Sequence, residues 1–300
     1  MRWNRAVCAL ALFSAGLLAQ EGKEEVVPYN VPDIENYLAM FKSDFGKKKV
    51  PQEDVIATLQ NLVKAHKYLS SKGEEATKDD AKLGKKIVKQ IAAGLKAKDR
   101  DMVSFECAKA LGVLADPEGQ RPLLSWMEDV VLEDKAPPMQ SVEAGFLALA
   151  KIGGTDTATL DLLRSYATGK HTDPAVASGA LKAVGEWRLI EANDRKEFFE
   201  KITGYVASLY SGMKGGEAKM RGVFEQRYKA VKENGLAALA ELAGDGTTFA
   251  DPPAATKWLN DNKKKKWEDY VGKGFRKGAT NEAAPAEEPE GEEKKPEGDA

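Results

Sequence analysis

A short apolar phrase that occurs four times along this 300-residue chain constrains its fold more than any other feature. Each copy begins with Ala-Leu and ends on an aliphatic residue followed by Gly or Ala: Ala-Leu-Gly-Val-Leu-Ala at 110–115, Ala-Leu-Ala-Lys-Ile-Gly at 148–153, Ala-Leu-Lys-Ala-Val-Gly at 180–185 and Ala-Leu-Ala-Glu-Leu-Ala at 238–243. The anchoring leucines are separated by 38, 32 and 58 residues: Leu111, Leu149, Leu181 and Leu239. The first two steps equal about one helical-hairpin repeat, and the third leaves room for a longer or degenerate unit. This period predicts a stacked array in which each unit buries its apolar face against its neighbours.

Apolar residues between 32 and 270 recur at helical spacing. Val142, Phe146 and Leu149 fall at i, i+4 and i+7, which places them on one face of a helix. Strand-type alternation is absent from this part of the sequence. We therefore expect an all-α fold with helices over eleven stretches: 33–45, 52–70, 80–97, 100–114, 118–133, 139–152, 157–168, 174–187, 194–211, 217–243 and 254–270.

Two Asp-Pro pairs mark the beginnings of helices. Asp116-Pro117 and Asp173-Pro174 each place a carboxylate before a proline at the first turn, where the missing N–H has no intrahelical partner to lose. Asn193 or Asp194 is expected to cap the helix that carries Phe198.

Glycines mark the ends of helices. Gly153, Gly169 and Gly212 follow apolar stripes and suit the left-handed conformation that terminates a helix. Within 217–243, Asn234-Gly235 is a turn-forming pair, so this helix is either continuous or broken at that point.

The first nineteen residues have the pattern of a targeting segment. Arg2 and Arg5 precede an uncharged apolar run, 6–18, and Ala19 offers a small residue for cleavage. Ser14-Ala15-Gly16 is a second possible cleavage site, and an uncleaved membrane anchor is the alternative. The run is shorter than the roughly 20 residues that a membrane-spanning helix needs. We expect an exported protein, periplasmic or secreted, with no transmembrane segment after cleavage.

Charge and cysteine content restrict the function further. Cleavage after Ala19 removes two of the 45 basic residues and leaves 43 against 47 acidic ones, a formal charge of −4. A nucleic-acid binder usually has a basic surplus, so no nucleic-acid partner is expected. Only Cys107 then remains, and its apolar helical position favours a small buried hydrophobe over a reactive thiol.

The side chains that could support catalysis do not form a recognisable motif. His66, His171 and Cys107 lack the spacing of a zinc site, and the chain has no Gly-x-Ser-x-Gly elbow. His171 with Asp173 could be a base and its partner, but a solvated loop histidine is the simpler interpretation. We therefore predict no catalytic residue, no cofactor and no metal ligand, and a protein that is not an enzyme.

One stretch carries a family resemblance. Cys107-Ala-Lys-Ala-Leu-Gly-Val-Leu-Ala-Asp-Pro117 resembles the first helix and turn of bacterial HEAT-like repeats, and 142–156 and 175–187 are weaker copies. The run from Leu239 to Phe249, followed by Asp251-Pro252 and Trp258, is similar to an ending found on some exported HEAT-like proteins. The resemblance implies a right-handed α-solenoid of stacked antiparallel helix pairs. It also implies a binding scaffold with no catalytic residues to carry over.

The C-terminal part combines a basic cluster with two tryptophans. The cluster consists of Lys263, Lys264, Lys265 and Lys266, with Lys273, Arg276 and Lys277 nearby. It is either an anion contact or a solvated helix face. On one straight helix over 254–270, Trp258 and Trp267 would point to opposite sides, since nine residues make two and a half turns. Trp258 is then expected to cover the end of the stack, and Trp267 to be more exposed.

These patterns divide the chain into four parts: a signal peptide (1–19), a flexible N-terminal segment (20–31), a HEAT-like helical repeat domain (32–272) and a disordered Ala/Pro/Glu/Lys-rich tail (273–300). The expected core residues are apolar members of the four phrases and one tryptophan: Leu111, Leu114, Leu149, Ile152, Leu181, Val184, Leu239, Leu242 and Trp258.

The sequence therefore favours a non-enzymatic protein–protein interaction scaffold of the bacterial cell envelope, with a protein partner of unknown identity. A binder of anionic envelope polymer, acting through the basic residues of 263–277, is the alternative. A HEAT-like lyase or glycosylase-type enzyme is a third and weaker hypothesis, because export and near-neutral charge do not suit the substrates of those enzymes.

Overall fold

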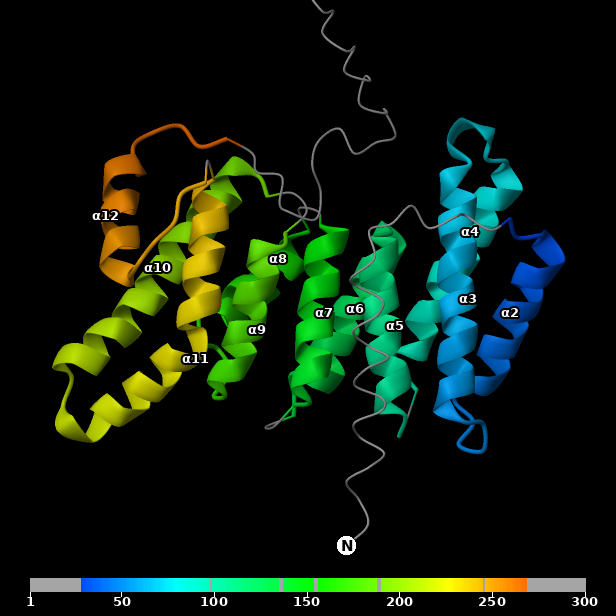
Figure 1. The fold of residues 1–300 in the computed structure, drawn as a ribbon, viewed down its shortest axis with the longest axis horizontal. Coiled ribbons are helices and arrows are strands. Elements are labelled where there is room, and N and C mark those ends of the chain that lie inside the picture. Colours follow the sequence, from blue (N-terminus) through cyan, green and yellow to red (C-terminus); the bar gives the residue numbers. More distant parts are fainter. Residues whose placement is uncertain are drawn as a thin grey trace, which may run out of the picture. The chain divides into compact units, whose positions relative to one another are not determined.

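The computed structural model describes residues 28–97, 99–134, 137–153, 156–187, 190–244 and 246–268, and every regular element in these ranges is a helix (Figure 1). The expected all-α class is therefore confirmed for the described part of the chain. The predicted signal peptide (1–19) and tail (273–300) lie outside the described residues. The chain falls into two compact units, which divide between Glu133 and Asp134.

The first unit is built around α3. Among the residues of this unit that the structure describes, the long helices are α2 (Val31–Asp44), α3 (Gln52–Ser71), α4 (Lys78–Gly94) and α5 (Asp101–Leu114). Helix α3 packs against the other three, and α4 also contacts α2 and α5. Large buried side chains fill the space between these helices: Phe41, Leu62, Ile87, Ile91 and Leu111.

Short helical turns complete the first unit. They are the 3-10 turns η2 (Gly73–Glu75) and η3 (Pro117–Gly119), the helix α6 (Gln120–Trp126) and the π-helical turn η4 (Met127–Val131). One helix was expected over 118–133, and the structure replaces it with three consecutive short segments of different pitch.

The described part of the second unit contains six helices: α7 (Met139–Ile152), α8 (Thr157–Ala167), α9 (Pro174–Gly185), α10 (Ala192–Gly215), α11 (Ala218–Ala243) and α12 (Pro252–Asn262). Helix α9 packs against α7, α8 and α11, and α10 packs against α8, α11 and α12. Helices α10 and α11 form a long antiparallel hairpin (Figure 1).

The repeated phrase lies on alternate helices, α5, α7, α9 and α11. Its four leucines are at most 1% exposed: Leu111, Leu149, Leu181 and Leu239. In the second unit the phrase-bearing helices pack in succession, α7 against α9 and α9 against α11. The phrase thus supplies the apolar face through which these helices contact one another.

The two Asp-Pro pairs begin helical segments as predicted. The carboxylate of Asp116 accepts the N–H of Glu118 at 2.8 Å, and that of Asp173 accepts the N–H of Ala175 at 2.9 Å. The prediction that Asn193 or Asp194 caps α10 was wrong. This helix begins at Ala192 without a side-chain cap, and Asp194 instead lies 3.4 Å from the guanidinium of Arg164.

Gly153 and Gly169 end helices with φ values of 71° and 85°, as predicted. Gly212 does not, because α10 continues to Gly215. A glycine stands at this position because of close packing between helices: a Cβ atom at Gly212 would lie 2.6 Å from the ring of Phe224 on α11. Glycine therefore lets the two helices of the hairpin approach each other at this point.

Helix α11 is continuous through Asn234-Gly235. The Asn234 amide donates to the backbone carbonyl and the hydroxyl of Ser178 on α9, at 3.2 and 2.9 Å. A Cβ atom at Gly235 would lie 3.0 Å from Val206 on α10. The turn-forming pair thus serves tight packing between helices rather than a turn.

The last helix ends at Asn262, well before the expected residue 270. The carbonyl of Asn262 accepts hydrogen bonds from the N–H of Lys265 and from the indole N–H of Trp267, so the chain turns back at this point. The rings of Trp258 and Trp267 consequently touch, with centroids 5.6 Å apart, and both are half-buried. The expectation that the two tryptophans point to opposite sides of one helix was wrong.

The folded part also begins earlier than residue 32. The Tyr29 ring packs against Tyr37 and Tyr68, with centroids 6.4 and 6.3 Å away. The Asn30 side chain accepts the N–H of Asp33 and caps α2. Residues 29–31 of the expected flexible segment thus belong to the first unit, whereas 20–27 lie outside the described residues.

Candidate functional site

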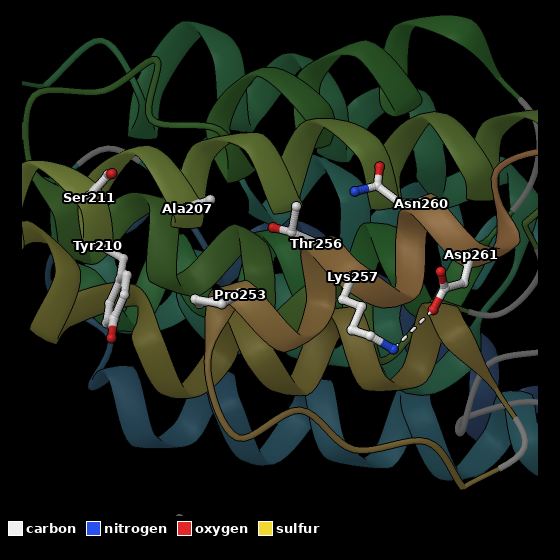
Figure 2. A pocket seen from close by; sticks show the side chains of 8 residues that line it. All are labelled: Ala207, Tyr210, Ser211, Pro253, Thr256, Lys257, Asn260 and Asp261. Atoms are coloured by element: carbon white, nitrogen blue, oxygen red, sulfur yellow. Dashed lines mark hydrogen bonds and ion pairs between the residues drawn. The ribbon is translucent and has the colours of Figure 1, made fainter.

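A groove lies between α10 and α12 in the second unit (Figure 2). We call it the α10–α12 groove. Its volume is about 590 Å³. Helix α10 contributes three lining residues and α12 contributes five: Ala207, Tyr210, Ser211, Pro253, Thr256, Lys257, Asn260 and Asp261.

A cluster of aromatic rings fixes α12 against α10 and so defines the groove. Phe199 of α10 is fully buried. Its ring centroid lies 4.8 Å from that of Trp258 and 5.7 Å from that of Trp267. Phe249, which precedes α12, contacts both Phe199 and Trp258. Edge-to-face and tilted ring pairs at these distances are attractive beyond the area they bury.

Arg195 ties the C-terminal segment to the same place. Its guanidinium donates to the carbonyls of Leu242 and Ala243 at the end of α11, at 2.6 and 2.8 Å. It also donates to the carbonyl of Glu268 at 2.9 Å and lies over the Trp267 ring, 5.1 Å from the centroid. One side chain thus satisfies helix-terminal carbonyls and holds 267–268 against α10.

The α10–α12 groove combines apolar and polar chemistry. Ala207, Tyr210 and Pro253 supply apolar surface, and Figure 2 shows the Tyr210 ring facing Pro253. Further along α12, Lys257 and Asp261 form an ion pair at 3.3 Å on the exposed side of the groove. An open groove of this kind suits a segment of another protein, which presents both apolar side chains and hydrogen-bonding groups.

A second, smaller cavity of about 290 Å³ lies in the first unit and contains His66. The imidazole Nε2 lies 3.7 Å from a carboxylate oxygen of Asp116, and Nδ1 lies 3.4 Å from the hydroxyl of Ser70. Burial lowers the pKa of His66, and the nearby Asp116 carboxylate opposes that shift. Since Ser70 is one turn along the same helix and the imidazole contacts are long, this grouping lacks the close geometry of a catalytic triad.

Asp80 in the same cavity has a structural explanation. Its carboxylate accepts the Lys72 ammonium and both the N–H and the hydroxyl of Thr77, each at 2.8 Å. These contacts lower the pKa of Asp80 to about 2, and the hydrogen bond from Lys72 makes the largest contribution. The Thr77–Asp80 pair is a capping box at the start of α4, which accounts for the ionised carboxylate without a ligand.

The structure places most of the expected core residues inside. Those that are at most 4% exposed are Leu111, Leu149, Ile152, Leu181, Val184, Leu239 and Leu242. Leu114 and Trp258 are half-buried. Cys107 is fully buried, and burial raises the pKa of its thiol well above the usual value, in keeping with the small buried hydrophobe that was expected.

The structure also places the His171–Asp173 pair and the lysines of the basic cluster. His171 Nδ1 accepts the backbone N–H of Asp173, whereas the Asp173 carboxylate caps α9, so the two side chains do not form a base and its partner. Lys263, Lys264, Lys265 and Lys266 are all exposed, and Lys263 lies 3.8 Å from Glu200. Lys273, Arg276 and Lys277 lie outside the described residues.

The α10–α12 groove was not predicted from the sequence. Helix α12 begins at Pro252, where the Asp251 carboxylate accepts the N–H of Ala254 at 2.9 Å. The side on which α12 meets α10 depends on rings that are distant in the sequence, Phe199 and Trp267, and no local pattern relates them.

Neither a metal site nor a membrane-spanning helix is found in the described part of the chain. Its residues contain no group of three or more His, Cys, Asp or Glu side chains placed to hold a metal ion. Among the same residues, no helix has the length and apolar character needed to cross a membrane. Comparison of the chain with protein-family models, with curated proteins and with solved structures finds no match.

Proposed function

We propose that the protein is a non-enzymatic protein–protein interaction scaffold of the bacterial cell envelope, built as a right-handed HEAT-like solenoid. The succession of phrase-bearing helices α7, α9 and α11 supports the repeat architecture, since each buries its leucine against a neighbour. The N-terminal pattern of 1–19 supports export.

The α10–α12 groove is the observation that carries the binding function. It is open, lies between two helices held rigidly by the aromatic cluster, and offers apolar surface beside an ion pair. A preformed groove binds a partner segment without having to order its own walls.

Site-specific photo-crosslinking in envelope extract tests this function. A photo-reactive residue at Ser211, within the groove, should give a discrete adduct with a partner protein, and the same residue at Lys182 on α9 should not. Asn260→Trp should fill the exposed side of the groove and abolish the Ser211 adduct, whereas Lys182→Trp should leave it intact. Equal labelling from both positions, or an adduct that survives Asn260→Trp, would rule out the groove as the binding site.

A second candidate function is binding of anionic envelope polymer through the basic cluster. The exposure of all four lysines, Lys263–Lys266, favours it. Charge-driven retention on an anionic matrix weakens steeply with added salt, and replacing Lys264, Lys265 and Lys266 by Gln should abolish it. Retention that is unchanged in this variant would exclude the cluster.

A further inference from the structure

The end of the α10–α11 hairpin extends beyond the buried core of the second unit. We call residues 212–227 the hairpin tip. The last buried residue of α10 is Leu209, and the first buried residue of α11 is Tyr228. The α10–α12 groove reaches α10 only as far as Ser211. Figure 1 shows the turn between α10 and α11 at the far end of the hairpin from α12.

Contacts within the hairpin hold the tip in shape. The Phe224 ring lies against Gly212, and the N–H of Gly216 donates to the carbonyl of Gly212 at 3.0 Å. The guanidinium of Arg221 donates to the carbonyl of Gly216 at 3.3 Å. The tip is thus a preformed convex structure.

Two large apolar side chains at the tip face solvent. Met220 is 47% exposed and Val223 is 41% exposed, and their i, i+3 spacing places them on one face of α11. A Cβ atom added at Gly222 would also meet nothing within 4 Å, so the surface of α11 around that residue is open as well.

The tip is also basic, although the whole chain has a net charge of −2. It carries four basic residues against Glu217 and Glu225: Lys214, Lys219, Arg221 and Arg227. The Glu225 carboxylate is already paired with Lys229 at 2.7 Å. By helical spacing, Lys219 and Arg227 lie on the same face of α11 as Met220 and Val223.

We infer that the hairpin tip docks on an anionic lipid membrane, with Met220 and Val223 entering the interface and the surrounding basic side chains contacting headgroups. A convex tip with exposed apolar residues among basic ones fits a flat anionic surface, which attracts both features together. The inference is independent of the α10–α12 groove and of the function proposed for it.

Vesicle co-sedimentation of the full chain tests the inference. Vesicles of phosphatidylcholine mixed with phosphatidylglycerol should bind the protein, and vesicles of phosphatidylcholine alone should not. Lys219→Gln with Arg227→Gln should reduce binding about 25-fold, because each basic residue near an anionic surface contributes roughly a factor of five. Met220→Ser with Val223→Ser should reduce binding as well, which simple ion exchange would not explain.

Two variants provide matched controls. Lys182→Gln with Lys201→Gln removes two exposed lysines of the second unit outside the tip and should leave vesicle binding unchanged. Lys264→Gln with Lys265→Gln removes part of the basic cluster and should have little effect. Circular dichroism should show the same helix content in every variant, since all the substituted positions are exposed.

Three outcomes would overturn the inference. They are equal binding to both kinds of vesicle, binding lost only in the Lys264/Lys265 variant, and tip variants that bind vesicles normally. If the tip variants bind vesicles normally but lose an acidic protein partner in crosslinking, the tip is a protein-binding surface instead.

Discussion

Two arginines show how single side chains organise loops in this protein. Arg100 is only 2% exposed, and its guanidinium donates to the carbonyls of Asp44, Lys47 and Val50, each at 2.8 Å. It thereby satisfies the end of α2 and the connection to α3. Arg195 does the same for the end of α11. The planar guanidinium suits this role because its donors point in several fixed directions.

We predict that Arg100→Ala lowers the free energy of unfolding by about 3–5 kcal/mol, because it removes a buried guanidinium and the three short hydrogen bonds that it donates to part-buried carbonyls. Arg100→Lys should also destabilise the fold, since one ammonium cannot reach all of these carbonyls. Urea denaturation measures both effects. The control is Lys48→Ala, an exposed residue paired with Asp99, which should change stability by less than about 0.5 kcal/mol. A similarly small effect of Arg100→Ala would contradict the buried role of the guanidinium.

At the scale of single helices, glycines differ in how much room there is for an added Cβ atom. A Cβ atom at Gly94, the last residue of α4, would lie 2.5 Å from the sulfur of Cys107 and 2.9 Å from the Phe41 ring, and both of these side chains are fully buried. The same atom at Gly222 of α11 would meet no neighbour. The same substitution should therefore have opposite effects in the two helices.

We predict that Gly94→Ala destabilises the protein by about 1–3 kcal/mol through overpacking of the core. Gly222→Ala should stabilise it by about 0.5–1 kcal/mol, because alanine is the better helix former and restricts the unfolded chain. Thermal and urea denaturation of the two variants provide the comparison. A gain in stability for Gly94→Ala would mean that α4 and α5 are less closely packed than the structure shows.

At the scale of the whole molecule, stability should depend on the leucines of the repeated phrase and not on the C-terminal tail. Leu149 is fully buried on α7, and α7 packs against α9. The sequence from Gly278 onward has no apolar stripe with which to bury surface.

We predict that Leu149→Ala costs about 2–5 kcal/mol in unfolding free energy, the range for emptying a packed leucine site. Removal of 278–300 should leave the denaturation curve unchanged. A loss below about 0.5 kcal/mol for Leu149→Ala would show that the register of the repeated phrase is wrong, and a clear shift on truncation would show that the tail contributes to stability.

The sequence alone was sufficient for the helical class and for most helix positions, because both depend on local interactions. The caps of Asp116 and Asp173 act on N–H groups two residues away, and the leucine spacing depends only on the pitch of a helix. The burial of Leu111, Leu149, Leu181 and Leu239 follows from the same periodicity.

Contacts between residues far apart in sequence decided where α11 and α12 end and where the α10–α12 groove forms. Asn234-Gly235 stays helical because Ser178 and Val206 supply partners that no local pattern indicates. The lysine run does not continue α12, because Trp267 turns back to Trp258 and Phe199. The α10–α12 groove depends on that aromatic cluster. Local pattern thus determines where helices form, whereas long-range packing determines which surfaces they leave open for binding.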